Sequence, residues 1–326
     1  MKITRLSSLA LVFTTLAYAI PATAADTVKD YPSRPIRLIV PNGPGSAVDT
    51  LTRIVTNKLT EVLGQQIVVD NRGGAAGVIG MVIGKEANPD GYTVITATTA
   101  ASTIARLMLK NPPYHPVKDY EPVVQFAATL NVLVINPKLP IKTVKDFIDY
   151  AKSGKGTFNM ASAGVGSQSH LSGAYFIQEA HIKSLHVPYK GGGASSGAVV
   201  SGESQWSLIP SPAAMGHVSA GRLRAIAHTL PKPTPLLSIP PVADTIPGFD
   251  YSGWMGFLVP KGTPKAIIEK LRAAVAKTME APEVKKAMAF QATEIVVLGP
   301  AAFRKVMEES MVKNAKLVKS LGLAAN

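Results

Sequence analysis

The sequence has no cysteine, and this absence removes three kinds of chemistry together. Its 326 residues hold no group that could form a disulfide, ligate a metal as a thiolate or act as a cysteine nucleophile. Aromatic residues make up only 6%, and the basic runs, at 285–286 and 304–305, are two residues long. A nucleic-acid-binding protein is therefore not expected, although the formal net charge is +13.

Motifs for binding phosphate, dinucleotides and metal ions are missing as well. The Gly84-Lys85 pair is followed by Glu86 and lacks the earlier glycine of a P-loop. The loop at 43–48 lacks the third glycine of a dinucleotide loop, and no His, Asp and Glu residues are spaced as metal ligands. We therefore expect neither a cofactor nor a metal ion.

Only the N-terminus carries a long apolar run. Residues 1–24 combine a basic start, an apolar stretch at 9–20 and the small-residue ending Ala22-Thr23-Ala24. Because a membrane span needs ~20 apolar residues, this shorter pattern predicts a secretory signal peptide cleaved before Ala25. No cysteine is present there for a lipid anchor, and losing two basic residues lowers the net charge from +13 to +11. This positive charge favours anionic partners.

A strand that breaks into a glycine loop and restarts as a helix is the most informative local pattern. Residues 36–40 are typical of a buried strand, and apolar residues from Leu51 to Leu59 recur at helical spacing. Between them, Gly43, Gly45 and Ser46 leave backbone N–H groups uncovered by side chains. Because the first turn of a helix has N–H groups without acceptors and a positive dipole end, this corner suits an anion such as a carboxylate.

A second corner of the same kind lies at 158–171, with Ser167 expected as the helix N-cap. Either corner alone could be only a well-formed helix start in an α/β domain. Two of them, more than a hundred residues apart, favour two lobes that face each other. A length of 326 residues is sufficient for two such lobes, each with its own core.

Strands and helices alternate around both corners. Strands at 67–69 and 92–96 join the first one, and the hydroxyls of Thr98, Thr99 and Ser102 are expected at a helix start, so a doubly wound parallel sheet is predicted. Ligands of such sheets lie at the carboxyl ends of the strands. Further expected elements are strands at 123–126 and 131–135, a helix at 141–152, a strand ending at 188 in a flexible glycine loop at 191–193, and strands at 206–211 and 223–228.

The rest of the chain is expected to return to the first lobe. A proline-rich linker at 231–241 precedes a strand at 251–259, and helices follow from 264 to 279, from 282 and from 300 to 321. Two chain crossings, near Phe126 and Tyr251, would form a hinge. The expected organisation is signal peptide 1–24, first lobe 25–126 and 251–326, and second lobe 127–250, with a ligand cleft between the lobes.

Motifs along the whole mature chain resemble one known family. They are Tyr31-Pro32-Ser33-Arg34-Pro35, Pro41-x-x-Pro44-Gly45-x-x-x-Asp49, Asn71-Arg72-x-Gly74-Ala75-x-Gly77, Pro89-Asp90-Gly91-Tyr92-Thr93, His115-Pro116-Val117-Lys118-Asp119, His186-Val187-Pro188-Tyr189-Lys190-Gly191 and Gly262-Thr263-Pro264. The chain is similar in these motifs and their order to the Bug-type solute receptors of tripartite tricarboxylate transporters.

The resemblance implies a monomeric, two-lobed periplasmic binding protein that is not an enzyme. It would close on a small carboxylate and deliver it to the membrane permease subunits of such a transporter. Carried over residue by residue, the ligand would contact one lobe at Asn42, Gly45, Ser46, Ala47, Asp49, Thr98, Thr99 and Ser102. The facing lobe would supply Ser162, Ala163, Gly166, Ser167, His170, Lys190 and Ser207.

Two departures from the family pattern bear on the ligand. Asn42 stands where the family commonly has an aromatic residue and Ser46 where it has a glycine, so this side of the pocket is expected to be more polar. The stretch at 207–211 lacks the Asp or Asn often found before its Pro-Ser pair, which disfavours an amino-acid ligand. Mono- and dicarboxylates, aliphatic or aromatic, remain.

Two other functions stay open at this point. A periplasmic hydrolase is one, since residues 160–164 approach the Gly-x-Ser-x-Gly motif around Ser162, although the first glycine is missing. His170, His181 and His186 are available as bases, but capping or surface roles explain them as well. The other alternative is a protein that presents its ligand to a membrane sensor.

Overall fold

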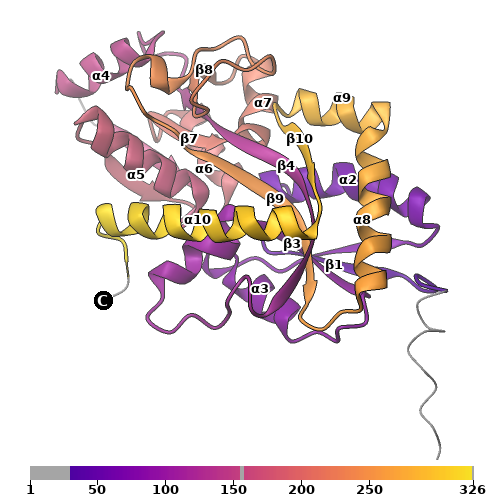
Figure 1. Cartoon of the computed structure of the whole chain (residues 1–326). Coiled ribbons are helices and arrows are strands. Elements are labelled where there is room, and N and C mark those ends of the chain that lie inside the picture. The colour runs from indigo at the N-terminus through magenta and orange to yellow at the C-terminus, as the bar shows by residue number, and fades with distance from the viewer. Residues whose placement is uncertain (1–29, 155–157, 325–326) are drawn as a thin grey trace, which may run out of the picture. The chain divides into compact units, whose positions relative to one another are not determined.

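The computed structural model describes residues 30–154 and 158–324 (Figure 1). The expected signal peptide and its cleavage site before Ala25 lie outside these residues. The chain divides into a unit that ends at Tyr31 and a compact unit, Pro32–Asn326, and the fold below is that of the second unit. In the described ranges, no helix combines the length and the apolar character needed to cross a membrane.

The first group of strands is parallel, as the sequence predicts. β1 (Ile36–Val40) lies between β2 (Ile67–Asn71) and β3 (Thr93–Thr98) and pairs with both in parallel. The connecting helices are α2 (Ala47–Leu63) and α3 (Val78–Lys85). Gly64 ends α2 in a left-handed conformation with φ of 68°, which a glycine adopts without a steric penalty.

A second parallel group repeats this arrangement. β5 (Asn159–Ser162) pairs in parallel with β6 (Leu185–Pro188) and β7 (Trp206–Pro210). α5 (Gln168–Ala180) follows β5, and α6 (Gly192–Ser201) follows β6. The expectation of a flexible glycine loop at 191–193 was therefore wrong, because Gly191 is the N-cap of α6 and the helix begins at Gly192.

One long strand joins the two groups. β4 (Tyr120–Ile135) pairs with β9 (Ser252–Pro260) over its first part and with β7 and β8 (Arg224–His228) over its last part, always antiparallel. The expected separate strands at 123–126 and 131–135 are thus one strand. No glycine or proline separates those two ranges, and β9 supplies partners through the intervening residues, so the chain stays extended.

The other helices surround this sheet. They are α4 (Val144–Lys152), α7 (Ser211–Ser219), α8 (Lys265–Glu280), α9 (Pro282–Phe290) and α10 (Pro300–Ser320). The sequence predicted all of these except α7, and it also missed β10 (Glu294–Leu298), which pairs with β4. Short turns complete the chain as η1 (Ala75–Gly77), η2 (Ala100–Ile104), η3 (Ala105–Met108) and η4 (Val242–Asp244). The helix expected after Thr98 and Thr99 is therefore a π turn followed by a 3₁₀ turn.

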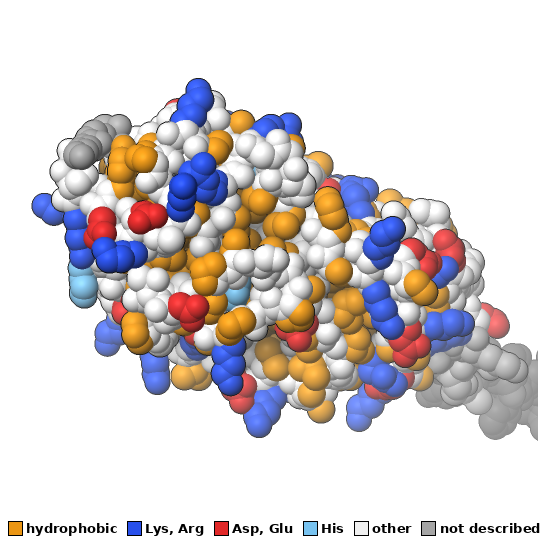
Figure 2. All heavy atoms as spheres, turned by 90° about the horizontal axis from the view of Figure 1, so that it is seen from above, with side chains coloured by type: hydrophobic (Ala, Val, Ile, Leu, Met, Phe, Trp, Pro, Cys, Tyr) orange, Lys and Arg blue, Asp and Glu red, His pale blue; other side chains and the backbone are white. Residues whose placement is uncertain are grey.

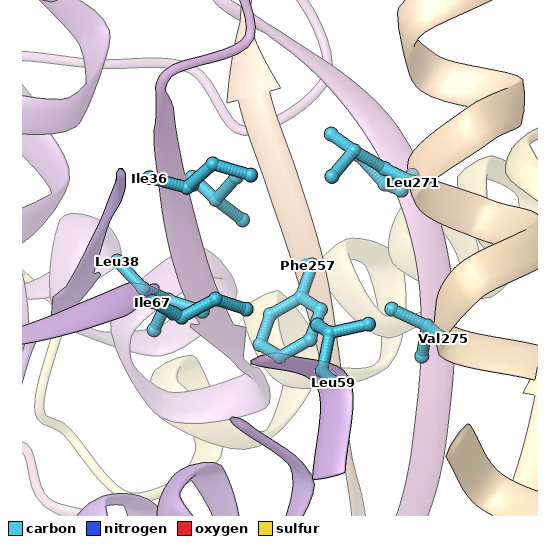
Figure 3. A pocket seen from close by; sticks show the side chains of 9 residues that line it. Ile36, Leu38, Leu59, Ile67, Phe257, Leu271 and Val275 are labelled. Carbon is cyan, nitrogen blue, oxygen red and sulfur yellow. The ribbon is translucent and has the colours of Figure 1, made fainter. Parts of the chain in front are cut away.

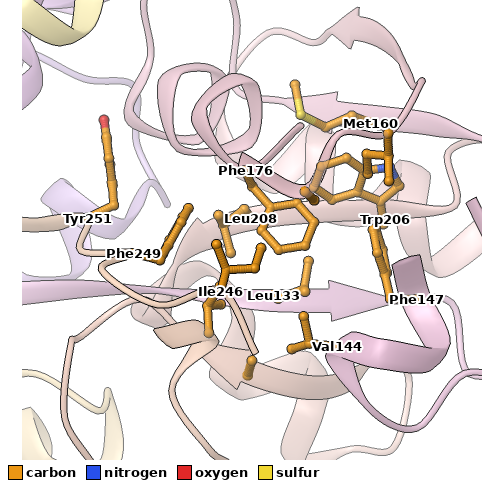
Figure 4. Close-up of a cluster of buried hydrophobic side chains, with 14 of the residues drawn as sticks. Leu133, Val144, Phe147, Met160, Phe176, Trp206, Leu208, Ile246, Phe249 and Tyr251 are labelled. Carbon is orange, nitrogen blue, oxygen red and sulfur yellow. The ribbon is translucent and has the colours of Figure 1, made fainter. Parts of the chain in front are cut away.

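Two buried clusters lie on the two sides of the point where β4 passes from the first strand group to the second. In the second group, Trp206 packs edge-on against Phe147 and Phe176 at ring-centroid distances of 5.0 and 5.7 Å (Figure 4). In the first group, Phe303 of α10 packs edge-on against Trp254 of β9. The far end of α10 reaches the other cluster through Val318, so the C-terminal helix contacts the cores of both groups.

A small gap in the core is not a binding site. It holds about 10 Å³ and is lined only by apolar side chains, among them Leu38, Leu59 and Phe257 (Figure 3). This space is about that of one water molecule, and a water there would have no polar partner. We interpret it as a packing gap between α2, α8 and the sheet.

Gly256 allows β9 to pack beneath α10, and this can be tested. A Cβ at this position would lie 2.5 Å from the carbonyl oxygen of Val124 and 2.5 Å from Phe303 Cζ. Gly256→Ala is therefore expected to destabilise the protein by about 1–3 kcal/mol through overpacking. Gly216→Ala is the control, because its Cβ would meet nothing within 4 Å in the interior of α7 and should stabilise by up to ~1 kcal/mol. Urea unfolding of both variants measures the difference, and equal stabilities would contradict this account.

Candidate ligand-binding site

A cavity of about 680 Å³ lies where the loops of the two strand groups meet. One side is formed by the loops that follow β1, β2 and β3, and the other by the loops that follow β5, β6 and β7. All six of these strands end at the cavity, as expected for ligand sites at the carboxyl ends of parallel strands. The volume falls within the range of small-molecule sites.

The first corner presents the N-terminus of α2 to this cavity. Ser46 is the N-cap, and its Oγ accepts a hydrogen bond from the Asp49 N–H at 3.2 Å. Helix geometry leaves the N–H groups of Ala47 and Val48 without acceptors inside α2. Because both residues line the cavity, these donors are available to an anion there.

Asp49 holds this corner together and does not line the cavity. Its carboxylate accepts hydrogen bonds from the Gly45 N–H, from Arg53 Nε and from Asn71 Nδ2, at 2.9 to 3.0 Å. Burial raises the pKa of Asp49, but these three hydrogen bonds outweigh it, so the pKa lies below the usual value. The carboxylate therefore stays ionised and holds the loop in place at Gly45, outside the lining of the cavity.

The second corner presents the N-terminus of α5. Ser167 is the N-cap, as predicted, and its Oγ accepts from the His170 N–H at 3.2 Å. The loop is fixed further by the Gly166 N–H, which donates to His170 Nδ1 at 3.1 Å. The N–H groups of Gln168 and Ser169 are left without acceptors inside α5, and both residues line the cavity.

A third helix, α6, also begins at the cavity. Its N-cap is Gly191 with φ of 97°, so no side chain caps the first-turn N–H groups of 192–194. Lys190, which is exposed, is the one charged side chain among the described residues that line the cavity. On the face of the molecule in Figure 2, Lys and Arg side chains are spread among acidic ones and form no single patch. Three helix N-termini and one lysine thus make the cavity locally favourable for anions.

Two stacked histidines lie beside the second corner. The rings of His170 and His186 are 4.1 Å apart at an interplanar angle of 17°, and His186 Nε2 lies 2.6 Å from Ser162 Oγ. Burial lowers the pKa of His170 to about 4, with a further contribution from His186. A Ser–His contact such as that of Ser162 and His186 is one part of a hydrolase site, but Ser162 is fully buried and does not line the cavity. Within the described ranges, no three His, Asp or Glu side chains are grouped to hold a metal.

The fifteen residues predicted from the sequence fall into three sets. Asn42, Ser46, Ala47, Thr98, Ala163, Ser167 and Lys190 line the cavity. Gly45, Asp49, Gly166 and His170 lie in the corner loops or first helical turns and support them. Thr99, Ser102, Ser162 and Ser207 are buried, and the Ser207 hydroxyl donates to the Ala161 carbonyl at 2.6 Å. As ligand contacts, all of them stay predictions.

Several lining residues were not predicted. The loop at 73–77 contributes, and there Ala75 and Ala76 have positive φ values of 46° and 54°, which few residues with a side chain adopt. Glycine pairs in the sequence marked this loop and the one at 191–193, and the rule that ligands lie at the carboxyl ends of parallel strands applied to both, but no residue of either loop was predicted as a ligand contact. Gln168, Ile209, Pro210 and Ala213 carried no signal.

Three known proteins show what this chain is similar to. BugT of Bordetella pertussis is 31% identical over 325 residues, which covers 99% of each chain. A solved R. palustris protein with adipate is 29% identical with a TM-score of 0.87, over 90% of this chain and 99% of that one. MatC from Rhodopseudomonas palustris with bound malate is 26% identical with a TM-score of 0.81, over 88% and 100% of the two chains.

The histidine stack predicts a loss of stability in acid. The ordinary pKa of histidine is about 6.5, so between pH 6.5 and 4 the unfolded chain takes up a proton that buried His170 does not. Stability therefore falls as the pH falls through this window, by on the order of 2 kcal/mol once solvent screening is allowed for. His170→Asn keeps an acceptor for Gly166 but cannot titrate, so urea unfolding at pH 7 and pH 4 should show a smaller loss. His181→Asn, at an exposed helix end, is the control, and identical pH profiles for all three proteins would contradict the prediction.

The comparison with protein families agrees with the similarities to BugT, to the R. palustris protein and to MatC. Residues 51–323 match the tripartite tricarboxylate transporter family receptor. The match spans most of the chain and includes the second corner, whereas the first corner, at 36–50, lies just before its start. The chain belongs to this receptor family, whose Bug-type members are solute-binding proteins and not enzymes.

Proposed function

We propose that this receptor captures a small carboxylate in the periplasm and delivers it to the permease subunits of a tripartite tricarboxylate-type transporter. The observation that carries the proposal is the convergence of three helix N-termini, those of α2, α5 and α6, on one cavity. Its described lining includes one lysine and no acidic side chain. Such a lining attracts an anion and offers no carboxylate to an ammonium group.

Two sets of donors face each other across the cavity. One set belongs to the first corner and the other to the second corner with the α6 N-terminus. A dicarboxylate engages both sets, whereas a monocarboxylate engages one and packs its apolar part against residues such as Val48 and Ile209. The similar proteins that were solved with adipate and with malate support a ligand of this class.

Closure of two lobes about β4 and β9 is the mechanism that we propose for capture. The lobes are those expected from the sequence, 25–126 with 251–326 on one side and 127–250 on the other. The ligand first binds one corner, and rotation about the crossing then brings the second corner onto it. The closed form, acting as a monomer, is the shape that the permease would recognise.

Thermal unfolding with a panel of acids tests this proposal. The chain without residues 1–24 is unfolded and refolded to remove any ligand carried through purification. It is then heated with mono-, di- and tricarboxylates, aromatic acids and amino acids. A ligand at a hundred times its dissociation constant adds ~2.7 kcal/mol of stability, so carboxylates of one structural class should raise the midpoint. A refolded protein that no acid stabilises would contradict the proposal.

Replacing the N-cap of α5 tests the site itself. Asp caps a helix as well as Ser, so Ser167→Asp keeps the hydrogen bond to His170 but adds a negative charge to the cavity. Binding of the carboxylate should weaken by about 10-fold or more through repulsion. Thr143→Asp is the matched control, since Thr143 caps the exposed start of α4 away from the cavity and should leave affinity unchanged. Titration calorimetry compares the two, and an unchanged affinity in Ser167→Asp would place the ligand elsewhere.

A further inference from the structure

We infer that Asn42 is a modification site, at which attack by the Gly43 backbone nitrogen deamidates the side chain and leaves a negative charge in the cavity. Of all the asparagines in the sequence, only Asn42 is followed by a glycine. Both residues line the cavity and belong to the loop between β1 and α2, outside any helix or strand. The reaction depends on this local structure alone, whereas its effect on the ligand rests on the proposed function.

The two groups that react are free of hydrogen bonds. Among the described residues, neither the Asn42 carboxamide nor the Gly43 N–H has a hydrogen-bond partner. The loop is held instead by its carbonyl groups. The Asn42 carbonyl accepts from Asn71 Nδ2 at 3.0 Å, and the Gly43 carbonyl accepts from the Ser46 N–H at 3.3 Å. The electrophile and the nucleophile therefore have no competing contact to break.

Two glycines leave room for the reaction. A Cβ added at Gly43 would meet nothing within 4 Å, so this residue lies in open space. A Cβ added at Gly73 would lie 3.0 Å from the Gly43 nitrogen and 3.2 Å from the Asn42 carbonyl carbon. A side chain at position 73 would thus cover the bond between Asn42 and Gly43. Because both neighbours are glycines, this bond stays uncovered beside the cavity.

Other asparagines lack this combination. Asn88, Asn111 and Asn136 precede prolines, which have no N–H group to attack with. Asn57 is exposed but lies within α2 and precedes a lysine. The N–H that follows it is hydrogen-bonded inside the helix, and the helical backbone is held in place. Asn57 is therefore a suitable reference for selective reaction at Asn42.

The reaction needs only water as a co-reactant. The Gly43 nitrogen forms a bond to Asn42 Cγ, the bond from Cγ to Nδ2 breaks, and ammonia leaves with the proton of the Gly43 N–H. The five-membered succinimide then takes up one water molecule and opens at either carbonyl. Opening yields an aspartyl residue or an isoaspartyl residue, whose backbone is longer by one carbon. Nothing is oxidised or reduced, and both products carry a new negative charge.

This charge arises where the cavity favours the ligand's own carboxylate. The loop of Asn42 leads into α2, whose first-turn N–H groups at Ala47 and Val48 are available to an anion in the same cavity. A covalent carboxylate in the loop repels the ligand and competes with it for these donors. Deamidation therefore lowers the affinity of the receptor as the protein ages. Conversely, a bound carboxylate holds the loop in place and slows ring closure.

Peptide mapping by mass spectrometry tests the site. The chain without residues 1–24 is incubated without ligand at mildly alkaline pH, and the same chain unfolded in guanidinium chloride gives the reaction of the unrestrained sequence. In the folded protein, Asn42 should convert while Asn57 stays intact. Asn42→Gln, which would need a six-membered ring, and Gly43→Ala, whose methyl group fits into open space but hinders the attack, should lose the reaction.

Calorimetry tests the effect on binding. Asn42→Asp has the side chain of one product and should bind the best acid of the thermal panel about 10-fold or more weakly. Asn57→Asp is the matched control, because it adds the same charge at an exposed position outside the cavity and should match the wild type. Adding this acid during the incubation should slow the conversion of Asn42. Thermal unfolding without ligand shows that the variants are folded.

Each part of the inference has a result that would overturn it. If Asn42 stays intact in the folded chain while the unfolded chain reacts, or if Asn57 converts equally, the site is wrong. Wild-type affinity in Asn42→Asp, measured with an acid that the wild type binds, would overturn the effect on binding. A protein that converts Asn42 but binds no acid would keep the modification site and contradict the proposed function alone.

Discussion

The strand β4 is the constraint on which the rest of the structure depends. The first part of this sixteen-residue strand pairs with β9, and its last part pairs with β7 and β8. Both strand groups therefore take their orientation from one backbone segment. Because the parallel strands of each group end at the cavity between the groups, the helices that follow these strands begin at the cavity. The positions of α2, α5 and α6 around one cavity follow from this pairing.

An anion site made of helix N-termini avoids a cost that buried charges would bring. A buried arginine or lysine must be desolvated, and when the ligand leaves it loses its partner. Backbone N–H groups are neutral and stay in place whether or not a ligand is present. The buried charge at the first corner is Asp49, whose carboxylate accepts hydrogen bonds from Gly45 of the loop, Arg53 of α2 and Asn71 of β2, and which does not line the cavity. Neutral donors at the cavity and a paired charge outside it suit a receptor that must bind and later release its ligand.

Local signals were predictable from the sequence, and long-range pairing was not. Ser167 caps α5 as its position predicts, because caps depend on a few neighbouring residues. The continuous β4, the strand β10 and the π turn after Thr98 depend on partners far along the chain, which no local pattern specifies. The same holds for single site residues. Ser207 lies in a predicted strand, yet its hydroxyl donates to the Ala161 carbonyl and the residue does not line the cavity.

The most direct test is a crystal structure of the mature chain grown with the acid that stabilises it most. We expect one carboxylate within about 3 Å of the first-turn N–H groups of α2 or of α5 and α6, and a dicarboxylate bridging the two corners. We also expect that Asp49 keeps its present hydrogen bonds in that complex. An acid bound outside this cavity, or held by Lys190 without contact to any helix N-terminus, would contradict the central claim.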